Sequence, residues 1–305
     1  TKDVDKCAEC IIRVTEEVGI DGLFTLVDLS VEAADWGEEV IYYEDKAAGP
    51  DYDKLLIKTP ADYDKVVPIN TRETPRMKDH LDLCRLLVEK KGHELPVIAF
   101  VFGPLGILSM LRGHDKIFKD MLKKKDLVHK ALRVITDCMI DYCDAIIETG
   151  VHAIMFDTLF ASRSILSKPA WDEFEGVYME EIANHLHAKN CPVMIHNCGA
   201  GVYFDIQIKR INPCLISYMN IPDDCTSMED IKEKYGKDIT LMGHIEPAWL
   251  MDVTKEEVFA ECKKQIDAYK KDGGFILATG CEYPAPLGFE QGKWMVEAAE
   301  LYGKY

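Results

Sequence analysis

The stretch Val193-Met194-Ile195-His196-Asn197-Cys198-Gly199 decides the fold, because an apolar run ends here in a histidine, a cysteine and a glycine. A later stretch, Phe275-Ile276-Leu277-Ala278-Thr279-Gly280-Cys281, repeats the pattern with one cysteine. Short apolar runs bounded by turn residues are typical of strands that are buried on both faces of a parallel sheet. We therefore expect two strands of one sheet, whose C-terminal ends bring His196, Cys198 and Cys281 together.

Length and composition point to a globular protein. The chain has 305 residues, of which 48% are hydrophobic and 29% are charged, a typical soluble profile. The formal net charge of −17 argues against nucleic acid or an anionic membrane as partner. No stretch approaches the 18 or so consecutive apolar residues of a transmembrane helix. The eleven cysteines lack the spacing of a small disulfide framework, so we expect mostly reduced thiols in a cytoplasmic protein.

Strands and helices alternate along the chain. Strands are expected to begin near residues 23, 96, 151, 192, 214, 239 and 274, the first running from Leu23 to Val27. Helices are expected at about 3–18, 31–36, 79–90, 115–124, 126–149, 169–188, 201–210, 228–235, 254–271 and 289–303, with a turn at 103–106 and a polar excursion with small helices at 41–75. This alternation predicts a parallel sheet covered by helices.

The fold class that follows is α/β, a (β/α)8 TIM barrel forming one domain over residues 1–305. Seven strands are expected, whereas a closed barrel needs eight. The eighth lies either in the excursion at 41–75 or before Thr1. We expect the second, because nothing in 41–75 has the pattern of a buried strand.

Reactive side chains gather where the expected strands end, and in such barrels the C-terminal strand ends form the active site. His196 and Cys198 are two residues apart, so on extended backbone their side chains leave on the same side. Zinc favours thiolate and imidazole ligands, and a catalytic zinc keeps one position open. A lone H-x-C is weak evidence, and Cys281 alone would more often be a core thiol. Together, on matched strand ends, the three predict a zinc site.

Four further residues at strand ends are candidates with open alternatives. Asp157 and His244 are the catalytic candidates. Asp157 could equally cap the segment that follows it, and His244 could be a fourth ligand, a proton carrier or a hydrogen-bonded rim histidine. Asp28 and Glu282 are the substrate-binding candidates, with similar alternatives.

The chain resembles the uroporphyrinogen decarboxylase superfamily, in particular its zinc-dependent corrinoid methyltransferase branch, which includes methylcobalamin:coenzyme M methyltransferases. The resemblance is carried by residues 27–37, Gly103-Pro104, 150–157, 195–199, 242–247 and 277–281. It implies that His196, Cys198 and Cys281 bind Zn2+, and that the cobalamin is carried by a partner corrinoid protein. It also implies a small-molecule methyl donor or acceptor, and an N-terminal segment with the first barrel strand, which we expect to be missing from this chain.

The chain departs from the decarboxylases of this superfamily at several positions. They carry an arginine-rich N-terminal segment, a tyrosine soon after the Gly-Pro turn and a late histidine, whereas this chain has Leu105-Gly106-Ile107-Leu108 and no histidine after His244. Asp28 does match the decarboxylase aspartate. The superfamily usually has asparagine and a smaller residue in place of His244 and Glu246. The sequence therefore favours a zinc-dependent methyltransferase over a metal-free decarboxylase or a non-catalytic docking barrel with structural zinc.

Overall fold

Seven parallel strands form one curved sheet in the computed structural model, which describes residues 3–25, 28–43, 48–284 and 286–304. They pair in chain order: β1 (Leu23–Phe24), β4 (Val97–Phe102), β5 (Ala153–Asp157), β6 (Val193–Asn197), β7 (Leu215–Tyr218), β8 (Thr240–Ile245) and β9 (Phe275–Thr279). All seven expected strands are present, although Leu26 and Val27 of the first lie outside the described residues.

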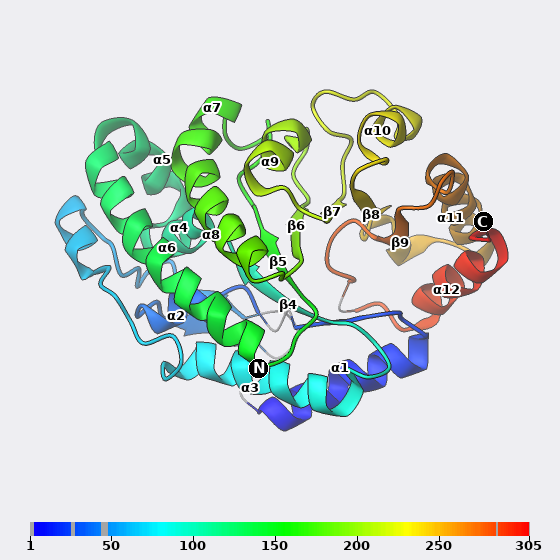
Figure 1. Ribbon diagram of the computed structural model, residues 1–305, viewed down its shortest axis with the longest axis horizontal. Helices are drawn as coiled ribbons and strands as arrows, with labels where there is room; N and C mark the ends of the chain where they lie inside the picture. Colours follow the sequence, from blue (N-terminus) through cyan, green and yellow to red (C-terminus); the bar gives the residue numbers. More distant parts are fainter. Residues whose placement is uncertain (1–2, 26–27, 44–47, 285, 305) are drawn as a thin grey trace.

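Helices cover the outside of this sheet (Figure 1). They are α1 (Val4–Val18), α2 (Val31–Asp35), α3 (Pro75–Lys91), α4 (Pro104–Arg112), α5 (His114–Lys123), α6 (Lys125–Glu148), α7 (Lys168–Trp171), α8 (Val177–Ala188), α9 (Phe204–Ile211), α10 (Met228–Tyr235), α11 (Lys255–Tyr269) and α12 (Glu290–Tyr302). The first helix, α1, packs against both α3 and the last helix, α12. The order of strands and helices confirms the TIM-barrel architecture expected from the alternation.

The excursion at 41–75 contributes no strand to the main sheet within its described residues. Strand β3 (Gly49–Pro50) lies in the excursion and pairs antiparallel with β2 (Val40–Ile41) in a separate two-stranded ribbon. The excursion also contains the 3-10 helix Pro60–Lys65. Thr59 and Asp62 form a capping box at the start of that short helix, so a small helix is present in the excursion as expected. Among the described residues no pairing joins β9 to β1, so the seven strands form an open, curled sheet.

The turn expected at residues 103–106 is wrong, because Pro104 begins helix α4. Every residue of α4 is buried, so the helix has no polar face and no 3.6-residue alternation from which to recognise it. Its proline stands in the first turn, where the missing N–H costs nothing. The expected helix at 169–188 is also divided, since the π-helical segment Asp172–Gly176 separates α7 from α8.

The sheet has a distinct inner face that leads to the site. Side chains from several strands meet there in one apolar cluster: Ile98, Ala153, Met155 and Leu215, with Phe24, Phe100, Met194 and Met242 packed against them. Because side chains alternate along a strand, the next inward positions are Asp157 on β5, His196 on β6 and Ser217 on β7. None of the described helices combines the length and apolar character that a bilayer crossing requires.

Candidate metal centre

The structure brings His196, Cys198 and Cys281 together. One ligand atom from each residue lies within 4.8 Å of the other two. His196 belongs to β6, Cys198 follows that strand directly, and Cys281 follows β9. Within the described residues this is the one such group of three or more histidine, cysteine or carboxylate ligands. Two thiols and one imidazole are a donor set that suits zinc and leaves one tetrahedral position for another ligand.

His196 is held in place by the neighbouring strand. It pairs with Ser217 in the register of β6 with β7, and its Nδ1 lies 3.0 Å from the Ser217 hydroxyl oxygen. His196 is 9% exposed, and its ring centroid lies 6.3 Å from that of Phe100 on the inner face. With Nδ1 engaged by Ser217, Nε2 is the nitrogen available to a metal.

The loop that carries Cys198 is fixed by hydrogen bonds on both sides. The Asn197 side chain donates to the carbonyl of Thr158 and accepts from the backbone N–H of Gly199 at 2.8 Å. The carbonyl of Cys198 accepts from the Asn220 side chain at 2.9 Å. A Cβ at Gly199 would collide with the Ser162 side chain, so glycine is needed directly after the cysteine.

Cys281 depends on a close approach between two strand ends. A Cβ on Gly280 would lie only 2.6 Å from the Cα of Met219, which follows β7. Glycine therefore lets the chain after β9 pass close to the end of β7. The Thr279 hydroxyl donates to the carbonyl of Cys281 at 2.7 Å. The glycines of both opening motifs thus have a steric role beside the thiols.

The three side chains are electrostatically coupled. Hydrogen bonds from Cys198 and His196 lower the pKa of the Cys281 thiol well below its ordinary value. The contact with Cys281 and burial raise the pKa of Cys198. Burial alone would lower the pKa of His196, but the hydrogen bond to Cys281 raises it. One thiolate is thus stabilised by its neighbours, and thiolate is the form that binds metal.

Asp157 and Glu282 lie next to this cluster in the structure. Asp157 ends β5 and pairs with His196 in the strand register. It is 9% exposed, and burial raises the pKa of its carboxyl to about 6. Glu282 directly follows Cys281 and is exposed. Partial desolvation and the neighbouring Cys281 raise the pKa of its carboxyl. The roles assigned to both carboxyls remain predictions.

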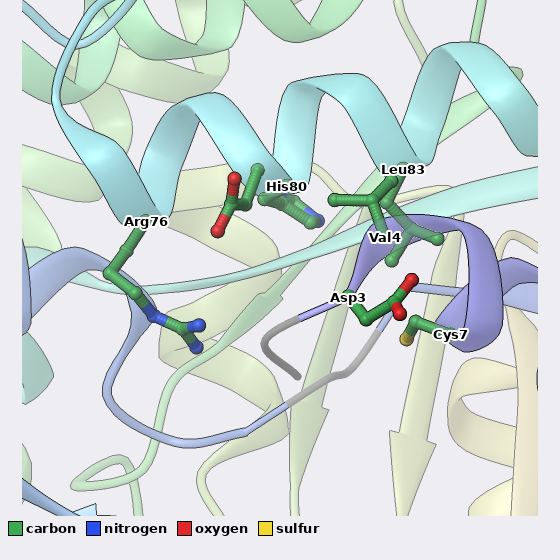
Figure 2. A pocket seen from close by; sticks show the side chains of 7 residues that line it. Asp3, Val4, Cys7, Arg76, His80 and Leu83 are labelled. Atoms are coloured by element: carbon green, nitrogen blue, oxygen red, sulfur yellow. The ribbon is translucent and has the colours of Figure 1, made fainter.

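Asp28 is engaged within the protein. Its buried carboxylate forms an ion pair with Arg76 of α3 and accepts a hydrogen bond from the Ser30 N–H at 2.9 Å. Arg76 and His80, both on α3, also line a small pocket between α1 and α3 (Figure 2). That pocket has a volume of about 10 Å³, room for about one water molecule. The predicted substrate-binding role of Asp28 remains a prediction.

His244 lies outside the three-residue cluster. Alternation from the inward Met242 predicts an inward ring, but the ring stacks on Tyr218 with centroids 5.2 Å apart and packs edge-on against Tyr269 of α11. Its backbone N–H donates to Gln265 of the same helix at 2.8 Å. Gly243, with φ of +139°, interrupts the alternation just before it. His244 therefore faces the helices and not the inner face of the sheet. It is not part of the three-residue cluster, and its catalytic role stays a prediction.

Two residues that position the site were not singled out from the sequence. Ser217 contacts the imidazole of His196, and Asn220 holds the loop of Cys198. A signal for Ser217 existed, because it is the one small polar residue in the strand Leu215–Tyr218. Only the pairing of β6 with β7 places it opposite His196.

Comparison with known proteins gives the family. The model of the family described as Uroporphyrinogen decarboxylase (URO-D) matches residues 1–302. The chain belongs to the uroporphyrinogen decarboxylase family. It is 26% identical over 301 residues to the methylcobamide:CoM methyltransferase MtbA of Methanosarcina mazei, covering 98% of this chain and 85% of the relative.

Other members of the family are about equally similar. A uroporphyrinogen decarboxylase of Aliarcobacter butzleri is 26% identical over 281 residues, which cover 90% of this chain and 78% of the relative. Among solved structures, a methyltransferase from Methanosarcina mazei superposes with a TM-score of 0.83 at 21% identity, covering 99% of this chain and 87% of that one. The fold is therefore that of the family, while identity alone does not separate methyl transfer from decarboxylation.

Proposed function

We propose that this chain is a zinc-dependent methyltransferase. It would move a methyl group between the cobalamin of a separate corrinoid protein and a small thiol, methoxylated or methylthio substrate. The observation that carries the proposal is the cluster of His196, Cys198 and Cys281, whose ligand atoms lie within 4.8 Å of one another at the ends of β6 and β9. The similarity to a methylcobamide:CoM methyltransferase supports it.

Zinc bound by these three side chains would supply Lewis acidity to the heteroatom that gives or receives the methyl group. The protein's own residues then have separate tasks. Ser217 orients the His196 ring. Asp157, on the same inner face and with its pKa raised to about 6, is proposed to hold or release the proton that accompanies transfer. Asp28 and Glu282 are proposed to contact the substrate.

The runner-up is a metal-free decarboxylase, which the similarity to a uroporphyrinogen decarboxylase keeps in view. That reaction gives no task to two thiols and an imidazole that converge on one point. The convergence of these three ligands therefore favours methyl transfer.

Metal content and activity test the proposal together. We expect about one zinc per chain in the wild type, and its loss in Cys281→Ala and His196→Ala, because each variant leaves only two ligands. Cys214→Ala is the matched control, since this exposed thiol precedes β7 at the opposite end of the sheet. Methyl transfer from methylcobalamin to 2-mercaptoethanol should fall with the zinc. A folded wild type without zinc, or a Cys281→Ala variant at full rate, would refute the proposal.

A further inference from the structure

A second pocket lies beside the metal centre, between the ends of β7 and β8 and helix α11. Its volume is about 320 Å³, and its lining residues are Met219, Asn220, His244, Glu246, Trp249 and Glu261. Two of these residues connect it to the metal ligands. Asn220 donates to the carbonyl of Cys198, and Met219 packs against Gly280, which precedes Cys281. A pocket of this size suits a small molecule.

His244 forms a rigid wall of the pocket. Its ring is fixed between Tyr218 and Tyr269, and its backbone is held by Gln265, so the ring is not free to turn. Nε2 of this ring is closed off from solvent. The polar groups that the pocket offers to a ligand are therefore those of its other lining residues.

The charge of the lining selects the kind of ligand. Glu246 and Glu261 contribute two carboxylates, and no lysine or arginine lines the pocket. The carboxylate of Glu261 accepts from Gln265 at 2.9 Å and pairs with Lys264 at 3.1 Å, but Lys264 is exposed and lies outside the lining. Burial lowers the pKa of His244, so its ring adds no positive charge near neutral pH. The pocket is therefore negative, and an anionic group such as a sulfonate would be repelled.

Trp249 completes a set of groups that suits an organic cation. Its indole is half-buried in the lining. A cation over an indole face is attracted by the negative face of the ring, and more strongly where water is excluded. The carboxylates of Glu246 and Glu261 in the same lining would neutralise the charge of such a ligand. Metal ions fit less well, because the lining offers an aromatic and a thioether face in addition to its few oxygen ligands.

We propose that this pocket binds a small organic ammonium ion. The N–H of the ammonium group would pair with the carboxylate of Glu261, and its carbon atoms would lie against Trp249. A role in holding the charged end of the methyl donor or acceptor rests on the proposed function. The binding itself does not, because none of the three metal ligands lines the pocket.

Calorimetric titration with trimethylammonium chloride tests the site in the zinc-supplied protein. We expect saturable binding to the wild type and about tenfold weaker binding to Glu261→Gln, because a neutral amide replaces the half-buried carboxylate of the lining. Glu256→Gln is the matched control; this exposed glutamate lies on the same helix outside the pocket and should leave the affinity unchanged. Neutral tert-butanol, of similar size, should bind much more weakly than trimethylammonium.

Further variants keep the result interpretable. Glu246→Gln alters an exposed side chain that the fold does not need, and it should also weaken binding, by a smaller factor because solvent screens its charge. Cys281→Ala should still bind trimethylammonium. Binding to this variant together with a zinc-free wild type would refute the proposed function and leave the pocket intact. Equal affinities for trimethylammonium and tert-butanol, equal affinities of the wild type and both glutamine variants, or no binding at all would overturn the pocket assignment.

Discussion

Nδ1 of His196 and the hydroxyl oxygen of Ser217 lie 3.0 Å apart on neighbouring strands. The two residues are register partners in the pairing of β6 with β7, so the main-chain hydrogen bonds of the sheet fix their separation. A ligand histidine that is held through its second nitrogen keeps one ring orientation and a more basic ligand nitrogen. The sheet therefore prepares the imidazole for a metal before any metal binds.

Removing the serine hydroxyl should weaken metal binding. We expect Ser217→Ala to lower zinc affinity about tenfold, the lower end of the range for groups that orient a ligand histidine. Competition with a chromophoric chelator measures this directly. Ser217→Thr keeps a hydroxyl and should retain most of the affinity. Zinc binding by Ser217→Ala at the wild-type affinity would show that the ring is oriented without this contact.

Zinc removal should abolish activity without unfolding the protein. The large apolar core around α4, α6 and α8 is built from buried side chains away from the three ligands, so packing rather than metal holds the barrel together. Dialysis against a chelator should stop methyl transfer and leave the far-UV circular dichroism spectrum unchanged, and added zinc should restore the rate. A loss of helical signal on chelation would instead indicate a structural zinc.

Asp157→Asn should separate proton transfer from metal binding. The amide has the same shape as the carboxyl but cannot exchange a proton, so we expect the rate to fall about 100-fold with zinc content unchanged. Asp238→Asn, an exposed position just before β8, is the control. A full rate in Asp157→Asn would leave Asp157 as a cap for the segment that follows it.

Glu175 should make stability depend on pH. It is fully buried, its carboxylate accepts from the Trp171 indole N–H at 2.7 Å, and burial raises its pKa from 4.5 to about 8. Between these values the native state keeps a proton that the unfolded chain has released, so stability falls as the pH rises. The slope for one such group approaches about 1.4 kcal/mol per pH unit.

Glu175→Gln should therefore flatten the decline of unfolding free energy between pH 5.5 and pH 8, as measured by urea denaturation. Glu181→Gln, an exposed position on α8 that pairs with Arg133, should leave the wild-type slope. Identical slopes for Glu175→Gln and the wild type would mean that Glu175 releases its proton near the ordinary glutamate value in the native state.

Breaking the buried ion pair should destabilise the protein strongly. Arg76→Ala leaves the fully buried Asp28 carboxylate without its counter-ion, which typically costs about 3–5 kcal/mol. Lys78→Ala is a matched change on the same helix that removes an exposed pair with Asp82, and it should cost under about 1 kcal/mol. Thermal unfolding of both variants compares the two pairs. Similar losses in the two would contradict the expected importance of burial.

Local sequence patterns predicted most of the fold. Each strand of the sheet is a short apolar run, and helices such as Lys255–Tyr269 begin at a capping residue, here Thr254, so both could be recognised from neighbouring residues alone. Helix α4 could not, because it is buried on every side and so has no amphipathic period. The same holds for the division at Asp172–Gly176, since a change in helical hydrogen bonding leaves no hydrophobic signature.

The sequence by itself determined the parallel strands and the identities of His196, Cys198 and Cys281, because strand ends and ligand types are local properties. Only the tertiary structure decided which side chains meet. It placed Ser217 against His196 through the strand register, and it turned His244 away toward Tyr218 and Tyr269. Those contacts depend on sheet pairing and helix packing between segments far apart in the chain, which alternation along a single strand does not specify.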